Sequence, residues 1–591
     1  MCGICGFLGK KSISSEELSR MNNSMTHRGP DDSGVEIVPL GNHYTGDNLY
    51  LGFGQRRLSI LDLSKRGHQP MWSKDKRIGV VFNGEIYNFK EIKKELDYPF
   101  SSDCDTEVII ASYLKWGMEC VNHLNGMFAI GLFDRENNAL FLFRDRLGVK
   151  PLYYWLSKDG LVFGSELKPI RLFPGFNEEI NRSVIPRYFV RKYICSPDTI
   201  YENVYKLEPG TYLRYDGIKV SKQKYWDACQ KYTELSSNPI VDFEEAKKLL
   251  KTELENAVKY RFISDVPVGL FLSGGYDSSL ITAVAQSISD HPLKTYSIGF
   301  SDEKISESAY AIAVSKHLGT EHTDMVITEE EMLGLIDKLP FYYDEPFADG
   351  SQLPTMLVSK LAKEHGVTVA LTGDGGDEFY CGYGSYVPGV RNDARRFLSD
   401  LVRESKVKDF LLDRNAIEYK GVRYEKKKYK EVKDPQVSKM LIDMDTYLPD
   451  DICCKVDRAT MRYSLEARCP FLDTNLVETS FKIPQFFKFF RGEGKYILKE
   501  LTYDYIPQKY MDRPKQGFGI PYKKWLHGPL REMLLNYSDD GYLNRQGLFD
   551  TKITKAFLSN YINHAEAASP DYSDIVWAFL IFQTWWDEIV K

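Results

Sequence analysis

The first 215 or so residues contain short hydrophobic runs that are separated by turns rich in Gly, Asn and Asp. Runs of this length between turn residues predict β-strands. The clearest lie at residues 77–89, 126–134, 139–145, 160–166 and 211–217. Helical spacing of apolar residues appears between them, at 15–27 and 105–117. We therefore expect antiparallel sheets layered with helices, an α+β domain.

The pattern changes after about residue 242. Apolar residues follow helical spacing over 243–262, and strand-like and helix-like segments then alternate. The strands are expected at 266–275, 293–300 and 367–378, and the helices at 278–288 and 307–319. Such alternation predicts a doubly wound parallel α/β sheet. The chain beyond it reads as mostly helical.

Two further segments stand out, one at the boundary between the domains and one near the end of the chain. Residues 217–241 are polar and without periodicity, so we interpret them as a linker between domains at 2–216 and 242–591. The apolar segment 573–590 is too short and too interrupted to span a membrane, and we expect it to be a packed core helix.

Composition narrows the possible functions. The 591 residues allow roughly two to four domains of about 150 residues, and 77 Lys+Arg against 83 Asp+Glu give a net charge of −6. That balance argues against nucleic-acid binding through a broad basic field. The N-terminus lacks the apolar core of a signal peptide, and ten cysteines are too few for a disulfide scaffold. We expect a cytoplasmic protein with no membrane partner.

Cys2 is the first candidate for chemistry. Removal of Met1 would give one residue both a thiol and a free α-amino group. An α-amine has a pKa near ~7.7–8.0, so it can serve as the base for the adjacent thiol at neutral pH. On position alone Cys2 is more simply an ordinary second residue. Its CxxC spacing with Cys5 lacks the second pair that a zinc site needs.

The sequence around Cys2 favours the catalytic interpretation. The motifs CGICGFLG, HRGPDDSG, QRRLSILDL, FNGEIYN and SDCDTEVI follow one another between residues 2 and 109. Together they resemble the glutaminase domain of class II glutamine amidotransferases, which are αββα N-terminal-nucleophile (Ntn) hydrolases. The resemblance implies that Cys2 is the nucleophile and that Asn83 and Gly84 donate hydrogen bonds to the oxyanion. It implies that Arg57 binds the α-carboxylate of glutamine, and that Glu85 and Asp105 bind its α-ammonium. It implies no metal for this step. The plainer alternative for Arg57 is an ordinary surface charge.

A second candidate site lies in VGLFLSGGYDSSLITA, residues 268–283. A Gly- and Ser-rich turn between a strand and a helix presents N–H groups to phosphate, although half of such turns would be plain turns. The turn lacks the GK[ST] of a Walker loop. Its SGGxDSS pattern resembles the PP-loop of N-type ATP pyrophosphatases. The resemblance implies that phosphate is bound by Ser273, Gly274, Gly275, Asp277, Ser278 and Ser279.

An acidic turn follows about 95 residues later, in LTGDGGDEFYCGYGSY. Carboxylates beside a phosphate site suit Mg²⁺, which prefers oxygen ligands. We expect Asp277 and Asp377 to bind Mg²⁺; a solvated acidic turn is the alternative.

Three downstream segments, 456–473, 492–500 and 513–521, resemble the C-terminal domain of glutamine-dependent asparagine synthetases. The resemblance implies that Lys495 neutralises the leaving pyrophosphate. It also implies that Phe271, Ile298, Thr372 and Gly373 line an adenosine site. Asp374 stands where many of these enzymes carry Glu, a residue thought to help the adenylation and ammonia steps. The side chain is one methylene shorter, which puts the substrate geometry in question.

The two halves together predict a two-step amidation. Ammonia released from glutamine would pass through an internal, mostly apolar passage and attack a carboxylate activated by ATP. Aspartate, giving asparagine, is the leading acceptor. Three local sequences leave a different acceptor open. They also resemble a subgroup that includes amidotransferases acting on other carboxylates, such as sugar acids of surface polysaccharides; these sequences are residues 344–355, the GDGGDE turn and residues 513–521. A catalytically silent regulatory relative is the third alternative, and the family resemblance allows a homodimer.

Overall fold

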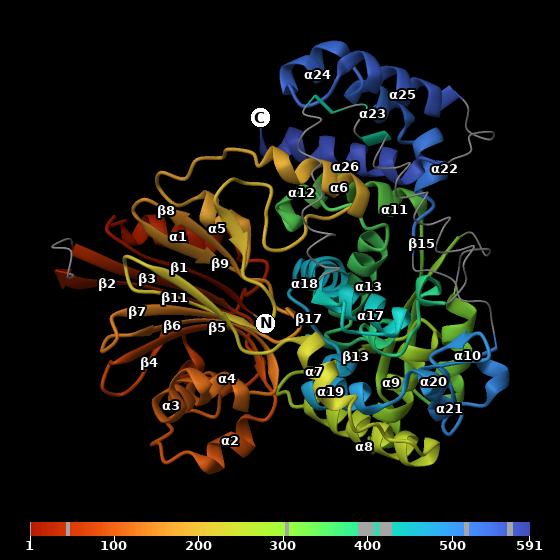
Figure 1. The fold of residues 1–591 in the computed structure, drawn as a ribbon, viewed down its shortest axis with the longest axis horizontal. Helices are drawn as coiled ribbons and strands as arrows, with labels where there is room; N and C mark the ends of the chain where they lie inside the picture. The colour runs from red at the N-terminus through yellow and green to blue at the C-terminus, as the bar shows by residue number, and fades with distance from the viewer. Residues whose placement is uncertain are drawn as a thin grey trace.

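The computed structural model describes residues 2–42, 48–301, 307–387, 406–407, 409, 411–412, 428–512, 519–563 and 571–590. The two halves of the chain lie side by side, the first in red to yellow and the second in green to blue (Figure 1). The boundary between them is filled by buried side chains of both halves. The halves therefore meet in a packed interface.

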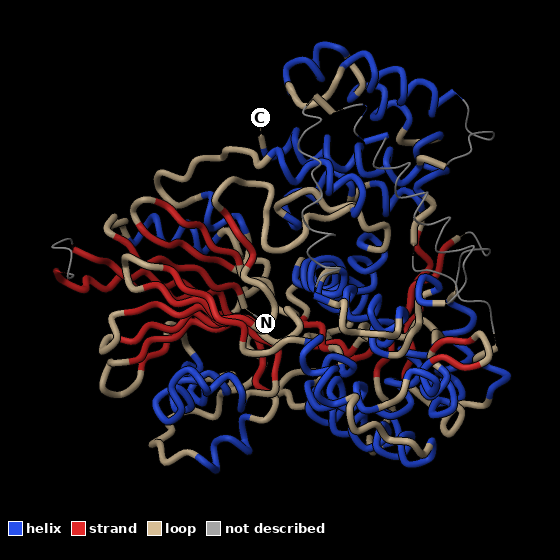
Figure 2. The backbone as a smooth tube through the Cα atoms, in the orientation of Figure 1, coloured by secondary structure: helices blue, strands red, loops and turns tan. Residues whose placement is uncertain are grey.

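The first half is built on two six-stranded antiparallel sheets that pack face to face (Figure 2). In sheet order, the first contains β10 (Val204–Lys206), β8 (Tyr153–Ser157), β9 (Gly160–Gly164), β1 (Gly3–Gly9), β3 (Asn48–Arg57) and β2 (Asp32–Asn42). The second contains β12 (Val220–Lys224), β11 (Thr211–Tyr215), β7 (Ala139–Arg144), β6 (Gly126–Asp134), β5 (Ile78–Ile86) and β4 (Met71–Trp72). Ile4, Phe53, Phe133, Leu142 and Phe163 fill the space between them.

Helices cover the outer faces of these sheets. α1 (Ser15–Asn23) and α5 (Leu167–Arg171) pack on the sheet that contains β1, while α2 (Phe89–Glu95), α3 (Asp105–Trp116) and α4 (Cys120–His123) belong to the layer beside β5. The capping box of Ser14 and Glu17 fixes the start of α1. The predicted αββα architecture is confirmed.

The segment expected to be a linker, 217–241, contains a strand and a helix. β12 pairs with β11 and extends the first-half sheet to Lys224, and α7 (Ala228–Leu235) packs against the second half. β12 is an edge strand in which Ser221 to Lys224 are exposed. Charged edge strands lack the hydrophobic alternation that marks internal ones, which explains why this strand was missed.

The second half contains the predicted parallel sheet, in the order β15 (Glu321–Ile327), β14 (Lys294–Phe300), β13 (Val268–Phe271), β16 (Val369–Leu371) and β17 (Glu466–Arg468). α8 (Phe243–Arg261) and α9 (Tyr276–Ser287) share a core with β13 and β16. α13 (Gln352–Glu364) packs on β14, and α18 (Cys453–Met461) packs on α13 and β17. The sheet is therefore covered on both faces. Its other helices include α10 (Ser308–Leu318), α12 (Leu339–Tyr343), α14 (Gly376–Phe379), α17 (Pro435–Asp445), α19 (Thr474–Lys482), α20 (Gln485–Lys488) and α21 (Tyr496–Thr502).

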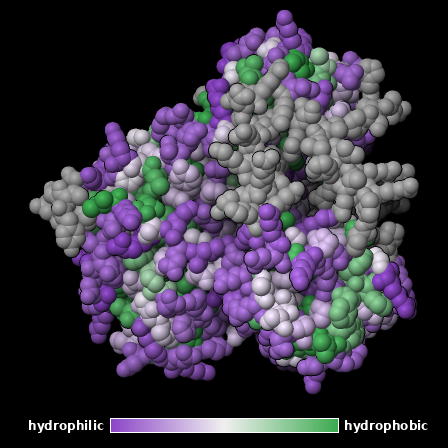
Figure 3. Space-filling model, in the orientation of Figure 1, coloured by the Kyte–Doolittle hydropathy of each residue, from purple (hydrophilic) through white to green (hydrophobic). Residues whose placement is uncertain are grey.

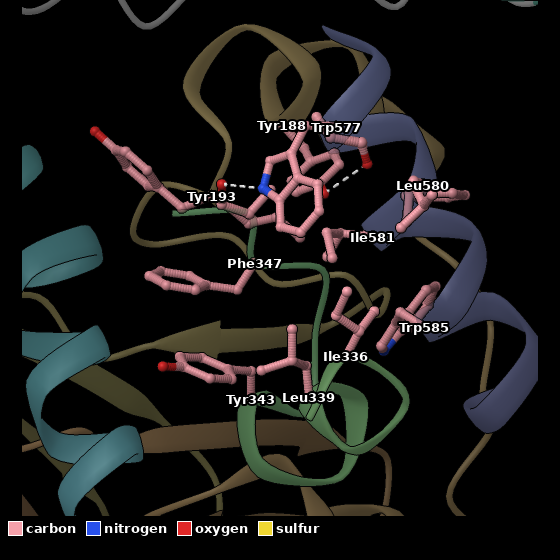
Figure 4. Close-up of a cluster of buried hydrophobic side chains, with 14 of the residues drawn as sticks. Tyr188, Tyr193, Ile336, Leu339, Tyr343, Phe347, Trp577, Leu580, Ile581 and Trp585 are labelled. Carbon is pink, nitrogen blue, oxygen red and sulfur yellow. Dashed lines mark hydrogen bonds between the residues drawn. The ribbon is translucent and has the colours of Figure 1, made fainter. Parts of the chain in front are cut away.

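A helical layer closes the second half: α22 (Tyr522–His527), α23 (Arg531–Tyr537), α24 (Asp540–Gln546), α25 (Thr551–Asn563) and α26 (Ser573–Ile589). α26 is the apolar segment that the sequence predicted to be a core helix, and twelve of its residues are buried. Figure 4 shows Trp577, Ile581 and Trp585 of α26 in one buried cluster with Tyr188 of the first half and Phe347 of the second. None of the described helices combines the length and the apolar character needed to cross a membrane. The face shown in Figure 3 is largely hydrophilic, with small hydrophobic groups between.

Candidate active sites

Cys2 immediately precedes β1 and contacts Asn83 of β5. Its backbone N–H donates to Asn83 Oδ1 at 3.0 Å, and both residues are buried. Burial raises the pKa of the Cys2 thiol above its ordinary value. Asn83 Nδ2 has no hydrogen-bond partner among the described residues. A buried amide donor without a partner beside a thiol is the arrangement that an oxyanion requires.

Gly84 brings its backbone close to the neighbouring strand. A Cβ atom at this position would lie 2.0 Å from the carbonyl oxygen of Met127, a contact that no side chain permits. Its φ of +155° also disfavours other residues. The backbone N–H of Gly84 therefore follows Asn83 in a conformation that requires glycine.

Arg57, Glu85 and Asp105 surround this end of the sheets. The Arg57 guanidinium is buried and donates to the carbonyl oxygens of Leu61, Asp62 and Ser64. The structure thus excludes the alternative of an ordinary surface charge. No ion pair between Arg57 and a carboxylate occurs in the described ranges.

The two acids differ in their surroundings. Asp105 begins α3 and accepts a hydrogen bond from the Ile86 N–H at 2.8 Å, and burial raises its pKa to about 6. Burial also raises the pKa of Glu85 well above its ordinary value, against the attraction of Arg468, which lies 3.2 Å away. Burial therefore raises the pKa of both carboxylates, and the Arg468 guanidinium opposes this effect at Glu85.

The second half reaches into this first site through β17, which sequence reasoning missed. Arg468 pairs with Glu85, and its Nε donates to Glu466 Oε1 at 2.6 Å. Both residues are fully buried and, being two positions apart on a strand, share one face. The only available signal was their position in the quoted segment 456–473, because the pairing itself depends on tertiary structure.

A second link joins Arg28 to Asp457 of α18. The Arg28 Nε donates to the Cys2 carbonyl oxygen at 3.1 Å. Its two Nη atoms donate to the Asp457 carboxylate at 2.7 and 3.0 Å. Two parallel N–H···O bonds fix both distance and orientation. The backbone of Cys2 is thus held by a residue whose other partner belongs to the second half.

A cavity of about 830 Å³ occupies the carboxyl ends of the second-half strands. Nearly all residues predicted for ATP binding line it, namely Phe271, Ser273, Gly274, Gly275, Asp277, Ser278, Ile298, Thr372 and Gly373. The predicted metal ligand Asp377 and the predicted catalytic residues Asp374 and Lys495 line it as well. Ser279 does not; its side chain is buried within α9. Gly274 has a φ of +74° and lies against α10, so the turn depends on glycine there.

Lys495 lies between Asp277 and Asp377. Its Nζ pairs with both carboxylates, at 2.8 Å from Asp377. Burial opposes the charge of Lys495, but the two aspartates raise its pKa above the ordinary value. A lysine and two carboxylates thus converge beside the N-terminus of α9, where phosphate oxygens would be stabilised.

The donor set fits Mg²⁺ only together with a ligand. Among the described residues, no group of three or more His, Cys, Asp or Glu side chains is arranged to hold a metal. Mg²⁺ commonly takes one or two carboxylates and completes its shell with phosphate oxygens and water. Asp277 and Asp377, the two carboxylates predicted to bind Mg²⁺, both line the cavity and would fit that role beside bound phosphate.

Glu378 extends the acidic turn into the protein. Burial and the neighbouring Asp377 raise its pKa to about 8, and the Tyr383 hydroxyl donates to it at 2.7 Å. Glu378 is therefore mainly protonated at neutral pH.

The cavity also contains charged residues that sequence reasoning missed, namely Lys192, Asp349 and Lys455. Lys192 belongs to the first half, immediately after α6 (Ile185–Arg191). No local pattern marks these residues, because Lys455 and Asp349 are more than 100 residues apart in the sequence and Lys192 reaches the cavity through the packing of the halves. Of the segment 513–521, residues 513–518 lie outside the described residues, while Gly519 lines the cavity.

A cavity of about 10 Å³ lies between the two sites. It is lined by Val149 and Lys150 of the first half and by Asp374, Ile452, Cys453, Val456, Asp457, Ala467 and Cys469 of the second. Asp457 is the partner of Arg28, whereas Asp374, Ile452 and Val456 also line the large cavity. The small cavity therefore borders residues of both sites.

Comparison with known proteins supports this division. Residues 1–226 match the family model of a glutamine amidotransferase domain, and residues 249–587 match that of asparagine synthase. The chain is 32% identical to asparagine synthetase [glutamine-hydrolyzing] 1 of Bacillus subtilis, over 99% of this chain and 96% of that protein. It is 42% identical to a putative asparagine synthetase of Methanocaldococcus jannaschii, over 68% and 79% of the two chains. It is 25% identical to amidase chry2 of Gibberella zeae, over 96% of each.

Proposed function

The chain belongs to the asparagine synthase family, and we propose that it uses glutamine and ATP to convert aspartate into asparagine. One observation carries the proposal: the thiol site of Cys2 and the phosphate-loop cavity lie in one chain, joined by a buried interface. The first site alone would only hydrolyse glutamine, and the second alone would lack a source of ammonia. Its substrates would be glutamine, ATP and aspartate.

The first site would release ammonia. After removal of Met1, the α-amino group of Cys2 would accept the thiol proton as sulfur attacks the amide carbon of glutamine. Asn83 Nδ2 and the Gly84 N–H would stabilise the oxyanion, a contribution of roughly 2.7–4 kcal/mol for each donor. Ammonia leaves, and water hydrolyses the thioester to glutamate. Arg57 would hold the α-carboxylate and Asp105 the α-ammonium, with Glu85 beside them.

The second site would activate the acceptor. The turn at 273–279 would bind the phosphates while an acceptor carboxylate oxygen attacks the α-phosphorus and pyrophosphate leaves. Lys495 would neutralise that leaving group, and Phe271, Ile298, Thr372 and Gly373 would line the adenosine site. Mg²⁺, held by Asp277 and Asp377, would offset the negative charge of the phosphates. Ammonia would then displace AMP from the acyl-adenylate, near Asp374.

The small cavity supports a route for ammonia between the sites. Its lining is mainly apolar, and it borders Asp457 on one side and Asp374 on the other. We infer that ammonia passes there, shielded from protonation in bulk water. We also infer a cytoplasmic location, since the ten cysteines, all among the described residues, form no disulfide.

Replacement of Cys2 tests the division of labour. The Cys2→Ala variant should lose glutamine-dependent synthesis by at least about 10³-fold, because the nucleophile is gone. Synthesis from added ammonium should remain. Cys5→Ala, on the same strand, is the matched control and should retain both activities. Loss of both activities in a folded Cys2→Ala protein would contradict the two-site scheme.

The acceptor is tested separately. Pyrophosphate release should be stimulated by aspartate and not by a panel of uronic acids, with ammonium as the nitrogen source. Stimulation by a uronic acid alone would assign the chain to the other carboxylates considered above.

A further inference from the structure

One end of the large cavity is where the acceptor carboxylate and ammonia would meet. Asp374, Ile452 and Val456 line both this cavity and the small cavity at the interface. Ammonia that passes along the interface would therefore enter here. The residue before Val456 is Lys455, and it too lines the large cavity. The charged groups around Lys455 therefore indicate which other charged groups the acceptor has besides its reacting carboxylate.

Lys455 is a buried lysine whose ammonium group does not use its hydrogen-bond donors within the described part of the chain. It is 8% exposed, and its ammonium makes no hydrogen bond with any described residue. The nearest carboxylate oxygen is Asp349 Oδ2, at 3.8 Å. Burying an ammonium group is costly unless it is paired and hydrogen-bonded. A buried ammonium group that lines a cavity and makes no hydrogen bond with the described residues therefore indicates a binding site for an anionic group of a ligand.

Asp349 is a fixed anion beside it. Its Oδ1 accepts hydrogen bonds from the Ser351 N–H at 2.6 Å and the Ser351 hydroxyl at 2.7 Å. Burial opposes its charge, but Lys455 and Ser351 hold the pKa of Asp349 down at about 2. Burial and the neighbouring Asp349 raise the pKa of Asp451 well above its ordinary value. Asp349 therefore keeps its negative charge.

We propose that Lys455 and Asp349 form a subsite for the α-amino-acid end of the acceptor, with Lys455 on the α-carboxylate and Asp349 on the α-ammonium. These two ligand groups share one carbon atom, so their partners must lie side by side, as Lys455 and Asp349 do. The subsite rests on the proposed function, and it specifies the acceptor class as an α-amino acid with a second carboxylate. An acid without an amino group would not supply the cation that the Asp349 carboxylate would bind, a difference that selects strongly between ligands.

The first half contributes to the same subsite through Lys192. Its carbonyl oxygen accepts from the Ala348 N–H at 2.8 Å, next to Asp349. Its side chain lines the cavity and lies 3.3 Å from Asp574, which also accepts from the Tyr522 hydroxyl at 2.5 Å. Lys192 thus places a second cation at the rim. Recognition of the acceptor would depend on both halves of the chain.

The experiment compares aspartate with two truncated acids, using added ammonium and measuring pyrophosphate release. The compound 3-aminopropionate lacks the α-carboxylate, and succinate lacks the ammonium. Wild-type enzyme should prefer aspartate to both. Lys455→Met should raise the KM for aspartate by roughly 10- to 100-fold, leave the KM for ATP unchanged, and reduce the preference over 3-aminopropionate by a similar factor. Asp349→Asn should reduce the preference over succinate instead. Lys360→Met, an exposed lysine on α13, is the control and should change nothing.

The outcomes separate the two proposals. Unchanged preferences in Lys455→Met and Asp349→Asn would overturn the subsite while leaving aspartate as the acceptor. If wild-type enzyme ignores aspartate but uses another α-amino acid through Lys455, the proposed function fails and the subsite stands. Use of a uronic acid alone would overturn both. If Lys455→Met does not fold, as judged by lost glutaminase activity, Lys192→Met replaces it. Lys192→Met should weaken aspartate binding by roughly 3- to 10-fold, because Lys192 lies at the rim of the cavity. An unchanged KM for aspartate would count against the subsite.

Discussion

Asp105 couples the proposed binding of glutamine to pH. Because burial raises its pKa to about 6, the carboxylate that would bind the α-ammonium of glutamine is protonated below that value. The KM for glutamine should therefore rise as pH falls below 6, by about tenfold per pH unit. Steady-state glutaminase assays between pH 5 and pH 8 measure this.

Substitution at position 105 provides the comparison. Asp105→Asn should raise the KM at pH 7.5 and remove the pH dependence. Asp103→Asn lies in the same motif, with a side chain 80% exposed, and should behave as wild type. An identical pH profile in Asp105→Asn would assign the dependence to another group.

Lys488 should make stability depend on pH in the alkaline range. The residue is 3% exposed, and its ammonium lies over the Tyr380 ring without an ion-pair partner among the described residues. Burial lowers its pKa from 10.5 to about 7. Between these values the unfolded chain binds the proton and the folded chain does not, so the free energy of unfolding should rise with pH from 7 to 10.5.

Denaturant titrations of Lys488→Met test this. The variant should be more stable than wild type at pH 7, and the difference should shrink toward pH 10.5. The exposed Lys524→Met should keep the wild-type dependence. Parallel curves for Lys488→Met and wild type would show that Lys488 titrates normally.

At the same scale, the sequence predicted only part of the sites. Cys2, Asn83 and the turn at 273–279 stand in local motifs, so their chemistry is readable from neighbouring residues. Lys192 and Lys455 have no such signal. Their roles arise from partners more than 100 residues away, such as Asp349 for Lys455.

At the scale of elements, α26 supports the loop that carries Asp349. Trp577 is fully buried, and its indole N–H donates to the Ala348 carbonyl oxygen at 3.0 Å. Trp577→Phe would leave that buried oxygen without a donor, which costs about 1–3 kcal/mol, and would open a small cavity. Thermal unfolding should occur at a lower temperature. The KM for aspartate should rise while glutamine hydrolysis stays unchanged.

Trp586→Phe is the matched control on the same helix, because that ring is only partly buried. It should have a smaller effect on both measurements. Equal effects of the two substitutions would mean that α26 stabilises the fold without positioning the loop.

Elements with strong periodicity were predicted well, since burial of one face imposes the pattern. β6 has the predicted bounds of 126–134, and the predicted helix at 243–262 is α8. The polar β12 was missed because an exposed edge strand carries no such constraint. Strand order and the pairing of β17 with β16 depend on contacts distant in sequence, which periodicity does not report.

At the scale of the whole molecule, buried charges join the two halves. Asp457→Asn would weaken the pairing of Arg28, leaving its buried guanidinium with Glu166 at 3.1 Å. Breaking a buried pair typically costs about 3–5 kcal/mol, and here the cost would fall on the interface that borders the small cavity. Nitrogen transfer should become inefficient, so that glutamate formed per pyrophosphate released rises above one. Synthesis from added ammonium should persist.

The exposed ion pair of Asp540 with Lys555 supplies the control, and Asp540→Asn should keep the ratio at one. A ratio of one in Asp457→Asn, despite lower stability, would separate the ion pair from nitrogen transfer.

α18 presents Lys455 to the large cavity and, about 200° further around the helix, Asp457 to the first half. The two halves are therefore not interchangeable modules. A chimera that takes its glutaminase half from a relative will couple ammonia release to synthesis only if that half brings charges complementary to α18 and β17. Covariation between the halves should be concentrated at Arg28, Glu85 and their partners.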